Sequence, residues 1–103
     1  MITYGFHPEA RLDLDEIWEF IGAYSVDTAD RIIAEILDAL DVLVTFPHRG
    51  HRRQDLTPRP LRFIQVRDYL ISYAPDESPL WIVAVLHGRR DPRVMAAILR
   101  GRE

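Results

Sequence analysis

The residues best suited to chemistry follow the most apolar stretch of the chain. His87, Arg89 and Arg90 come directly after residues 80–86, which are all apolar. Arginine binds phosphate through paired hydrogen bonds, and histidine exchanges protons near neutral pH. The other basic candidates lie mid-chain: Arg49, His51, Arg52, Arg53 and Arg62. If folding gathers these side chains, they could bind RNA, whose own 2′-hydroxyl would attack the phosphodiester. Arg62, His87 and Arg90 would then be the catalytic set.

A purely structural role is the alternative for each histidine. A histidine at a strand end is more often hydrogen-bonded within the fold than catalytic. His48 and His51 lie three residues apart in a loop and the chain has no cysteine, so this spacing does not indicate a metal site. Gly88 stands alone, without the further glycines of a phosphate-binding loop. We therefore expect neither a metal nor a cofactor.

Charge is divided unevenly along the chain. Residues 1–46 carry ten carboxylates and two arginines, a net charge of −8, whereas residues 47–103 carry six carboxylates and eleven arginines, a net charge of +5. All 13 Lys+Arg residues are arginine, which stays charged when partly buried. The basic half is thus suited to an anionic partner, unless its arginines are only a solvated surface.

Three predicted strands would position the candidate residues. The segment 61–90 is rich in aromatic and β-branched residues, with Arg67-Asp68 as a tight link and residues 75–79 as a loop. Its last strand, residues 80–87, begins with seven consecutive apolar residues, which predicts a place in the middle of a sheet with both faces covered. Side-chain alternation puts Arg62 on a sheet face near the start of the first of these strands.

Two amphipathic helices precede the strands. Apolar residues recur at spacings of three and four over residues 10–24 and again over residues 29–44, with Pro8 placed to begin the first helix. Ser25 or Asp27 could cap the second helix, and Pro47 ends it. So short a break favours an antiparallel helical hairpin that covers one face of the sheet.

Two short elements complete the expected fold. Residues 2–6 predict an N-terminal edge strand, and a short C-terminal helix could begin at Asp91 and Pro92. We expect one domain over residues 1–103, of α+β class, with a three-stranded antiparallel sheet packed on the hairpin. The absence of cysteine, of a signal peptide and of any membrane-length apolar run predicts a cytoplasmic protein that does not contact membranes.

The order of these elements resembles the ParE/RelE superfamily of toxins from bacterial type II toxin–antitoxin modules. The resemblance runs from the first strand to Asp91. Its most specific marks are Arg62, the strand YLISY at residues 69–73, and the ending VLHGRRD at residues 85–91. It implies a small sheet on a helical hairpin, neutralised by a ParD-like antitoxin with which the toxin forms a hetero-oligomer.

The two branches of the superfamily imply different targets. RelE-like proteins cut messenger RNA on the ribosome with basic residues and a C-terminal aromatic or histidine, whereas ParE-like proteins inhibit DNA gyrase. Arg62 and Arg90 match basic positions of the ribonuclease branch, but no tyrosine, histidine or lysine follows Arg90. A missing general acid typically costs about 10²- to 10⁴-fold in rate, unless His87 substitutes for it.

The resemblance therefore favours a non-enzymatic, gyrase-directed toxin, with a RelE-like ribonuclease as the alternative. A non-toxic, degenerate relative that only binds antitoxin is the third hypothesis. Under the ParE-like hypothesis no catalytic residue is expected. Binding of target or antitoxin is then assigned to an aromatic residue and a set of arginines: Trp18, Arg49, Arg52, Arg53, Arg62, Arg89 and Arg90.

Overall fold

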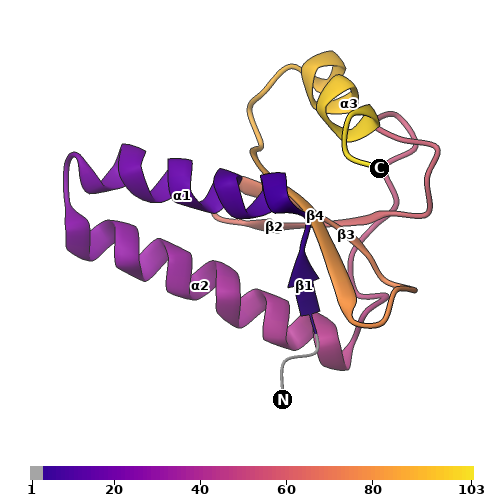
Figure 1. Ribbon diagram of the computed structural model, residues 1–103, viewed down its shortest axis with the longest axis horizontal. Helices are drawn as coiled ribbons and strands as arrows, with labels where there is room; N and C mark the ends of the chain where they lie inside the picture. The colour runs from indigo at the N-terminus through magenta and orange to yellow at the C-terminus, as the bar shows by residue number, and fades with distance from the viewer. Residues whose placement is uncertain (1–3) are drawn as a thin grey trace.

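A computed structural model describes residues 4–103 (Figure 1). The elements follow the predicted order. They are β1 (Tyr4–Phe6), α1 (Pro8–Gly22), α2 (Val26–Thr45), β2 (Arg62–Val66), β3 (Tyr69–Ala74), β4 (Leu80–His87) and α3 (Pro92–Arg100). The predicted α+β fold is confirmed.

The helix ends follow from local hydrogen bonding. His7 precedes α1, and its Nδ1 accepts the backbone N–H of Glu9 at 3.1 Å, while Pro8 occupies the first turn. Ser25, one of the two predicted caps, begins α2 because its Oγ accepts the N–H of Thr28 at 3.2 Å. The break between the helices is short, so they form the predicted hairpin, visible on the left of Figure 1.

The sheet has four strands in the order β1-β4-β3-β2. The strands from β2 to β4 pair antiparallel, as predicted, and β4 lies between two neighbours. β1 is an edge strand that pairs parallel to the start of β4, from Tyr4 opposite Leu80 to Phe6 opposite Ile82. The N-terminal strand therefore extends the antiparallel sheet into a mixed one.

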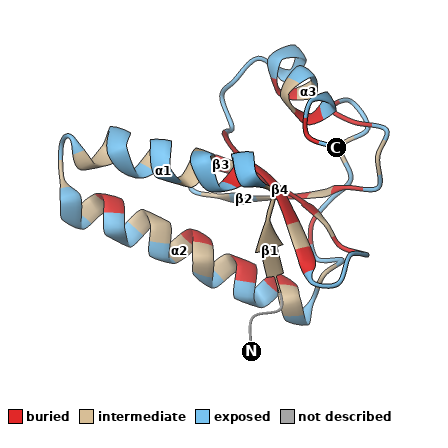
Figure 2. Cartoon of the chain, viewed as in Figure 1, coloured by how far each residue is buried: buried red, intermediate tan, exposed pale blue. Residues whose placement is uncertain are grey.

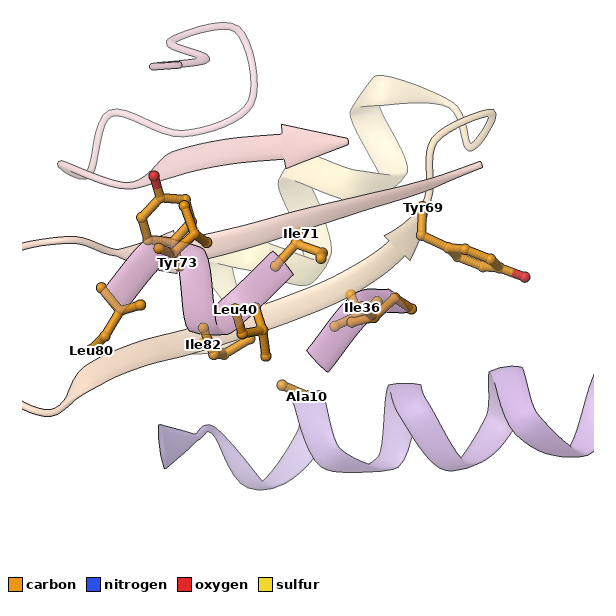
Figure 3. Packing of buried hydrophobic residues seen from close by; sticks show 10 residues of the cluster. Ala10, Ile36, Leu40, Tyr69, Ile71, Tyr73, Leu80 and Ile82 are labelled. Atoms are coloured by element: carbon orange, nitrogen blue, oxygen red, sulfur yellow. The ribbon is translucent and has the colours of Figure 1, made fainter. Parts of the chain in front are cut away.

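Each face of the sheet has its own apolar core, which is why β4 is buried along most of its length (Figure 2). The hairpin covers the face that includes Ile71, Tyr73 and Ile82, which pack near Ile36 and Leu40 of α2 (Figure 3). The opposite face packs against α3 and the loop before β2, with these buried residues: Leu56, Leu61, Phe63, Val83, Leu86, Met95 and Leu99. Within residues 4–103, no helix combines the length and the apolar character needed to cross a membrane.

An ion pair closes the part of the β4 edge that β1 does not reach. The Asp13 carboxylate of α1 accepts the Val85 N–H at 2.9 Å and also binds the guanidinium of Arg102, from which one nitrogen lies 2.9 Å away. Arg102 also donates to the carbonyl of Val83 at 3.2 Å. Arg59 in turn donates to the Arg102 carbonyl at 3.1 Å. The segment after α3 is thereby fastened to α1 and to the central strand.

Candidate binding surfaces

A basic hollow of about 490 Å³ lies between α2 and the outer edge of β2. Arg49, His51 and Arg53, which are alternate residues of the loop before β2, line it, whereas Arg52 does not. Apolar side chains supply most of the remaining lining: Ala39, Val42, Leu43, Phe63, Ile64, Val66 and Leu70. This hollow combines positive charge with an apolar floor, as a site for an acidic, partly apolar peptide requires.

The loop that carries these cations is held against the sheet. Arg62 donates to the carbonyls of His48 at 3.2 Å and Gly50 at 2.7 Å. The Gly50 N–H donates to the buried hydroxyl of Tyr73 at 2.9 Å. A Cβ at position 50 would lie 2.6 Å from that hydroxyl oxygen, so the contact requires glycine. Arg62 therefore shapes the hollow through the loop backbone.

A second hollow, of about 690 Å³, lies between the helical hairpin and the sheet, where β3 begins and β4 ends. Tyr69, His87 and Arg90 all line it, so a titratable group does stand in the same hollow as Arg90. Burial raises the pKa of Tyr69, with Asp68 as a smaller cause. Two groups of side chains complete the lining: the charged Asp13, Glu16, Arg67 and Asp68, and the apolar Ile17, Phe20, Ile21, Ile32 and Val85.

His87 is held by contacts within the fold. Its Nδ1 accepts the backbone N–H of Arg89 at 3.2 Å, and its ring packs edge-on to Tyr69 with centroids 5.6 Å apart. Nδ1 must therefore carry its lone pair, which leaves the proton of a neutral ring on the exposed Nε2. These contacts are those of a histidine that is hydrogen-bonded within the fold, which is the alternative to a catalytic role for His87.

The structure does not bring Arg62 to His87 and Arg90. Arg62 is opposite Tyr73 at the start of β2, whereas His87 is opposite Tyr69 at the end of β4. Because β2 and β4 are both antiparallel to β3, these two positions lie at opposite ends of the sheet, about 13 Å apart along the strands alone. The condition for one catalytic set, that folding gathers these side chains, is therefore not met for Arg62 with His87 and Arg90.

Several arginines are also occupied by intramolecular partners. Arg53 binds both carboxylate oxygens of Asp55, at 2.9 and 2.8 Å, and this hydrogen bonding lowers the pKa of Asp55. Arg67 binds Glu35 of α2 in the same bidentate way, through hydrogen bonds of 2.7 and 2.8 Å to its two carboxylate oxygens. Arg89 and Arg90 are exposed after β4, and Arg52 is exposed in the loop. Positive charge is therefore dispersed over several surfaces.

Trp18 has a structural role in the hairpin. Its indole Nε1 donates to the carboxylate of Asp30 at 2.8 Å, which joins α1 to α2. The indole also approaches Gly22, where a Cβ would lie 3.8 Å from two ring carbons. The side chain is still 39% exposed, so the predicted contact of Trp18 with a partner stays a prediction.

Sequence reasoning missed the residues that connect distant elements. Asp13 lies on the polar side of the first amphipathic helix, where a solvated carboxylate is the usual expectation, yet its side chain is only 12% exposed. Arg102 and Tyr73 likewise act through contacts with segments far away along the chain. No local pattern marks such partners. Within residues 4–103, no cluster of three or more histidine, cysteine or acidic side chains could hold a metal ion.

Comparison with known families identifies the chain. Residues 4–92 match the sequence model of a family described as the ParE toxin of type II toxin-antitoxin system, parDE. The chain belongs to this family. No individual curated protein matches it. As a ParE-family protein it is the toxin of a type II toxin–antitoxin module, and an antitoxin is its implied partner.

The geometry gives this ParE-family toxin two separate candidate surfaces. One is the basic hollow beside β2, and the other is the mixed-charge hollow below the hairpin. Their linings share no residue: the first hollow includes the loop before β2, and the second includes the end of β4. Both reach the β2–β3 link, where Val66 lines the first hollow and Arg67 the second.

Proposed function

We propose that this toxin inhibits DNA gyrase by binding to it, without cleaving RNA, and that a ParD-like antitoxin neutralises it. The observation that carries the proposal is the separation of Arg62 from His87 and Arg90 at opposite ends of the sheet. A ribonuclease needs charge-neutralising and proton-transferring groups around one phosphodiester. The ParE family membership supports the same branch of toxins.

A RelE-like ribonuclease stays the second candidate because Tyr69, His87 and Arg90 line one hollow. Those residues could in principle serve one phosphate. However, Glu16 and Asp68 line the same hollow, and their negative charges oppose binding of a phosphodiester. Arg67, a further cation there, is bound to a carboxylate of α2. The local charge therefore favours a protein partner over RNA.

Parallel assays on the purified toxin separate the two candidates. We expect the toxin to block supercoiling by gyrase and to leave translated messenger RNA intact. Uninhibited gyrase in the presence of excess toxin would refute the proposal. Codon-phased cleavage that disappears in His87→Ala and Arg90→Ala would establish the ribonuclease. Normal growth on expression without antitoxin, in place of growth arrest, would indicate a non-toxic relative.

A further inference from the structure

The turn end of the helical hairpin carries exposed aromatic side chains. Phe20, near the end of α1, is 68% exposed, and Tyr24, in the turn that follows, is 84% exposed. Their rings pack edge-to-face with centroids 6.1 Å apart, so together they form an aromatic ridge. Figure 1 shows this end of the hairpin extending past the strands of the sheet. Adjacent aromatic rings left in water are typical of surfaces that bind another protein.

The aromatic ridge borders the second hollow, between the hairpin and the sheet, because Phe20 also lines that hollow. Beside Phe20 the wall is apolar and consists of Ile17, Ile21 and Ile32, each of which is only partly buried. An apolar side chain that enters from a partner would remove this surface from water, which is favourable. The hollow and the ridge therefore form one continuous apolar surface.

The charged side chains of the hollow favour a cationic partner. Two of them already have ionic partners within the protein: Asp13 and Arg67. The others are Glu16, Asp68 and Arg90, all of them exposed. None of these three forms a side-chain ion pair with any of residues 4–103. When His87 is neutral, two carboxylates are thus available against one guanidinium.

The target in the proposed function has complementary chemistry. An enzyme that binds DNA presents lysine and arginine to the phosphates, so its surface near the DNA is positively charged. Glu16 and Asp68 can pair with such cations, while the aromatic ridge covers an apolar side chain beside them. The basic hollow beside β2 has charge of the opposite sign and suits a different partner.

We propose that the second hollow and the aromatic ridge bind gyrase through a surface segment in which an apolar side chain lies next to an arginine or lysine. The apolar side chain enters the hollow against Phe20 and Ile21, and the cation pairs with Glu16 or Asp68. This inference rests on the gyrase part of the proposed function and names the toxin surface that performs it. It is independent of how the antitoxin binds.

An aromatic substitution tests the apolar contact on purified toxin. The readouts are inhibition of supercoiling and the dissociation constant for gyrase. Phe20→Ala should weaken both about tenfold or more, because it removes an exposed ring that the partner covers. Phe46→Ala is the matched control, since it removes another exposed ring, at the end of α2, that does not line the hollow. It should change both readouts by less than about threefold.

A charge reversal tests the cationic contact. Glu16→Lys should weaken binding about tenfold or more, because a cation then faces a cation. Asp15→Lys is the matched control: it reverses the charge of the neighbouring residue, about 100° around the helix and outside the lining, and should cost less than about threefold. Added salt should weaken the wild-type complex more steeply than that of Glu16→Gln, because salt screens the ion pair.

The outcomes separate the surface from the function. Phe20→Ala and Glu16→Lys should fold, as circular dichroism and thermal melting establish, and should keep their affinity for the antitoxin within about threefold. A tenfold loss of that affinity in either folded variant would overturn the assignment to the target. Losses in Glu16→Lys no larger than in Asp15→Lys would overturn the cationic chemistry of the occupant.

Two results for gyrase itself complete the test. If the wild-type toxin inhibits gyrase and the folded Phe20→Ala and Glu16→Lys variants inhibit it equally well, the surface is wrong and the proposed function stands. A wild-type toxin that does not inhibit gyrase would refute the proposed function, and this occupant with it.

Discussion

Replacement of Asp13 by alanine should strongly destabilise the toxin. The substitution removes the acceptor of the Val85 N–H and the partner of Arg102, whose side chain is only 10% exposed. An unpaired, mostly buried guanidinium then remains beside an unpaired backbone donor. Breaking one side of a buried ion pair costs about 3–5 kcal/mol. That is a large part of the roughly 5–15 kcal/mol that stabilises a domain.

Urea unfolding followed by circular dichroism measures this loss. With a slope of about 2 kcal/mol per molar urea, the midpoint should fall by about 1.5–2.5 M. Glu9→Ala is the matched control on the same helix, because Glu9 lies 3.8 Å from Arg102 and its side chain is 55% exposed. Its removal should cost less than about 1 kcal/mol.

The comparison can also refute the reasoning. If Asp13→Ala changes the free energy of unfolding by no more than Glu9→Ala does, the pair does not hold the β4 edge as described. The double variant Asp13→Leu with Arg102→Met replaces both charges by apolar side chains. It should recover part of the lost stability, because no buried charge is then left without a partner.

Two further predictions concern single side chains. Ser72→Ala should raise the free energy of unfolding by about 1 kcal/mol in urea titrations, because the buried Ser72 hydroxyl has no hydrogen-bond partner. A lower free energy of unfolding in the variant would mean that the hydroxyl does have a partner. Arg67 lowers the pKa of Glu35 below its ordinary value of 4.5, so the stability from this pair is present above about pH 4.5 and is lost as pH falls through the lowered pKa. Unfolding curves of wild type and Glu35→Gln should therefore converge on acidification, and a constant difference down to pH 2 would contradict this.

Much of the fold was predictable because its signals are local. The apolar run of residues 80–86 marked the central strand, and the spacing of apolar residues marked both helices of the hairpin. Cap residues such as Ser25 and Asp91 marked helix starts through hydrogen bonds within two or three residues. The partner of the N-terminal strand was not predictable, because three residues carry no information on which edge they join.

The candidate site was predictable only in its residue types. Arg49 and Arg62 were both selected as basic candidates, but nothing in their sequence neighbourhood showed that one would line a hollow and the other would hold its loop. The separation of Arg62 from His87 follows from strand order and direction, which are tertiary properties. The burial of Asp13 likewise depends on Arg102, which is 89 positions away in the sequence.

The pairing of β1 with β4 has a consequence for how the chain folds. Tyr4 and Leu80 are neighbours in the sheet although about three quarters of the chain separates them. Closing so long a loop costs entropy before any contact repays it, and such topologies fold slowly. The helical hairpin and the β2–β3 turn can form early because their contacts are local, whereas pairing of the N-terminal strand with β4 is expected to form later. Until it does, the start of β4 is exposed to other chains, so concentrated refolding should favour aggregation.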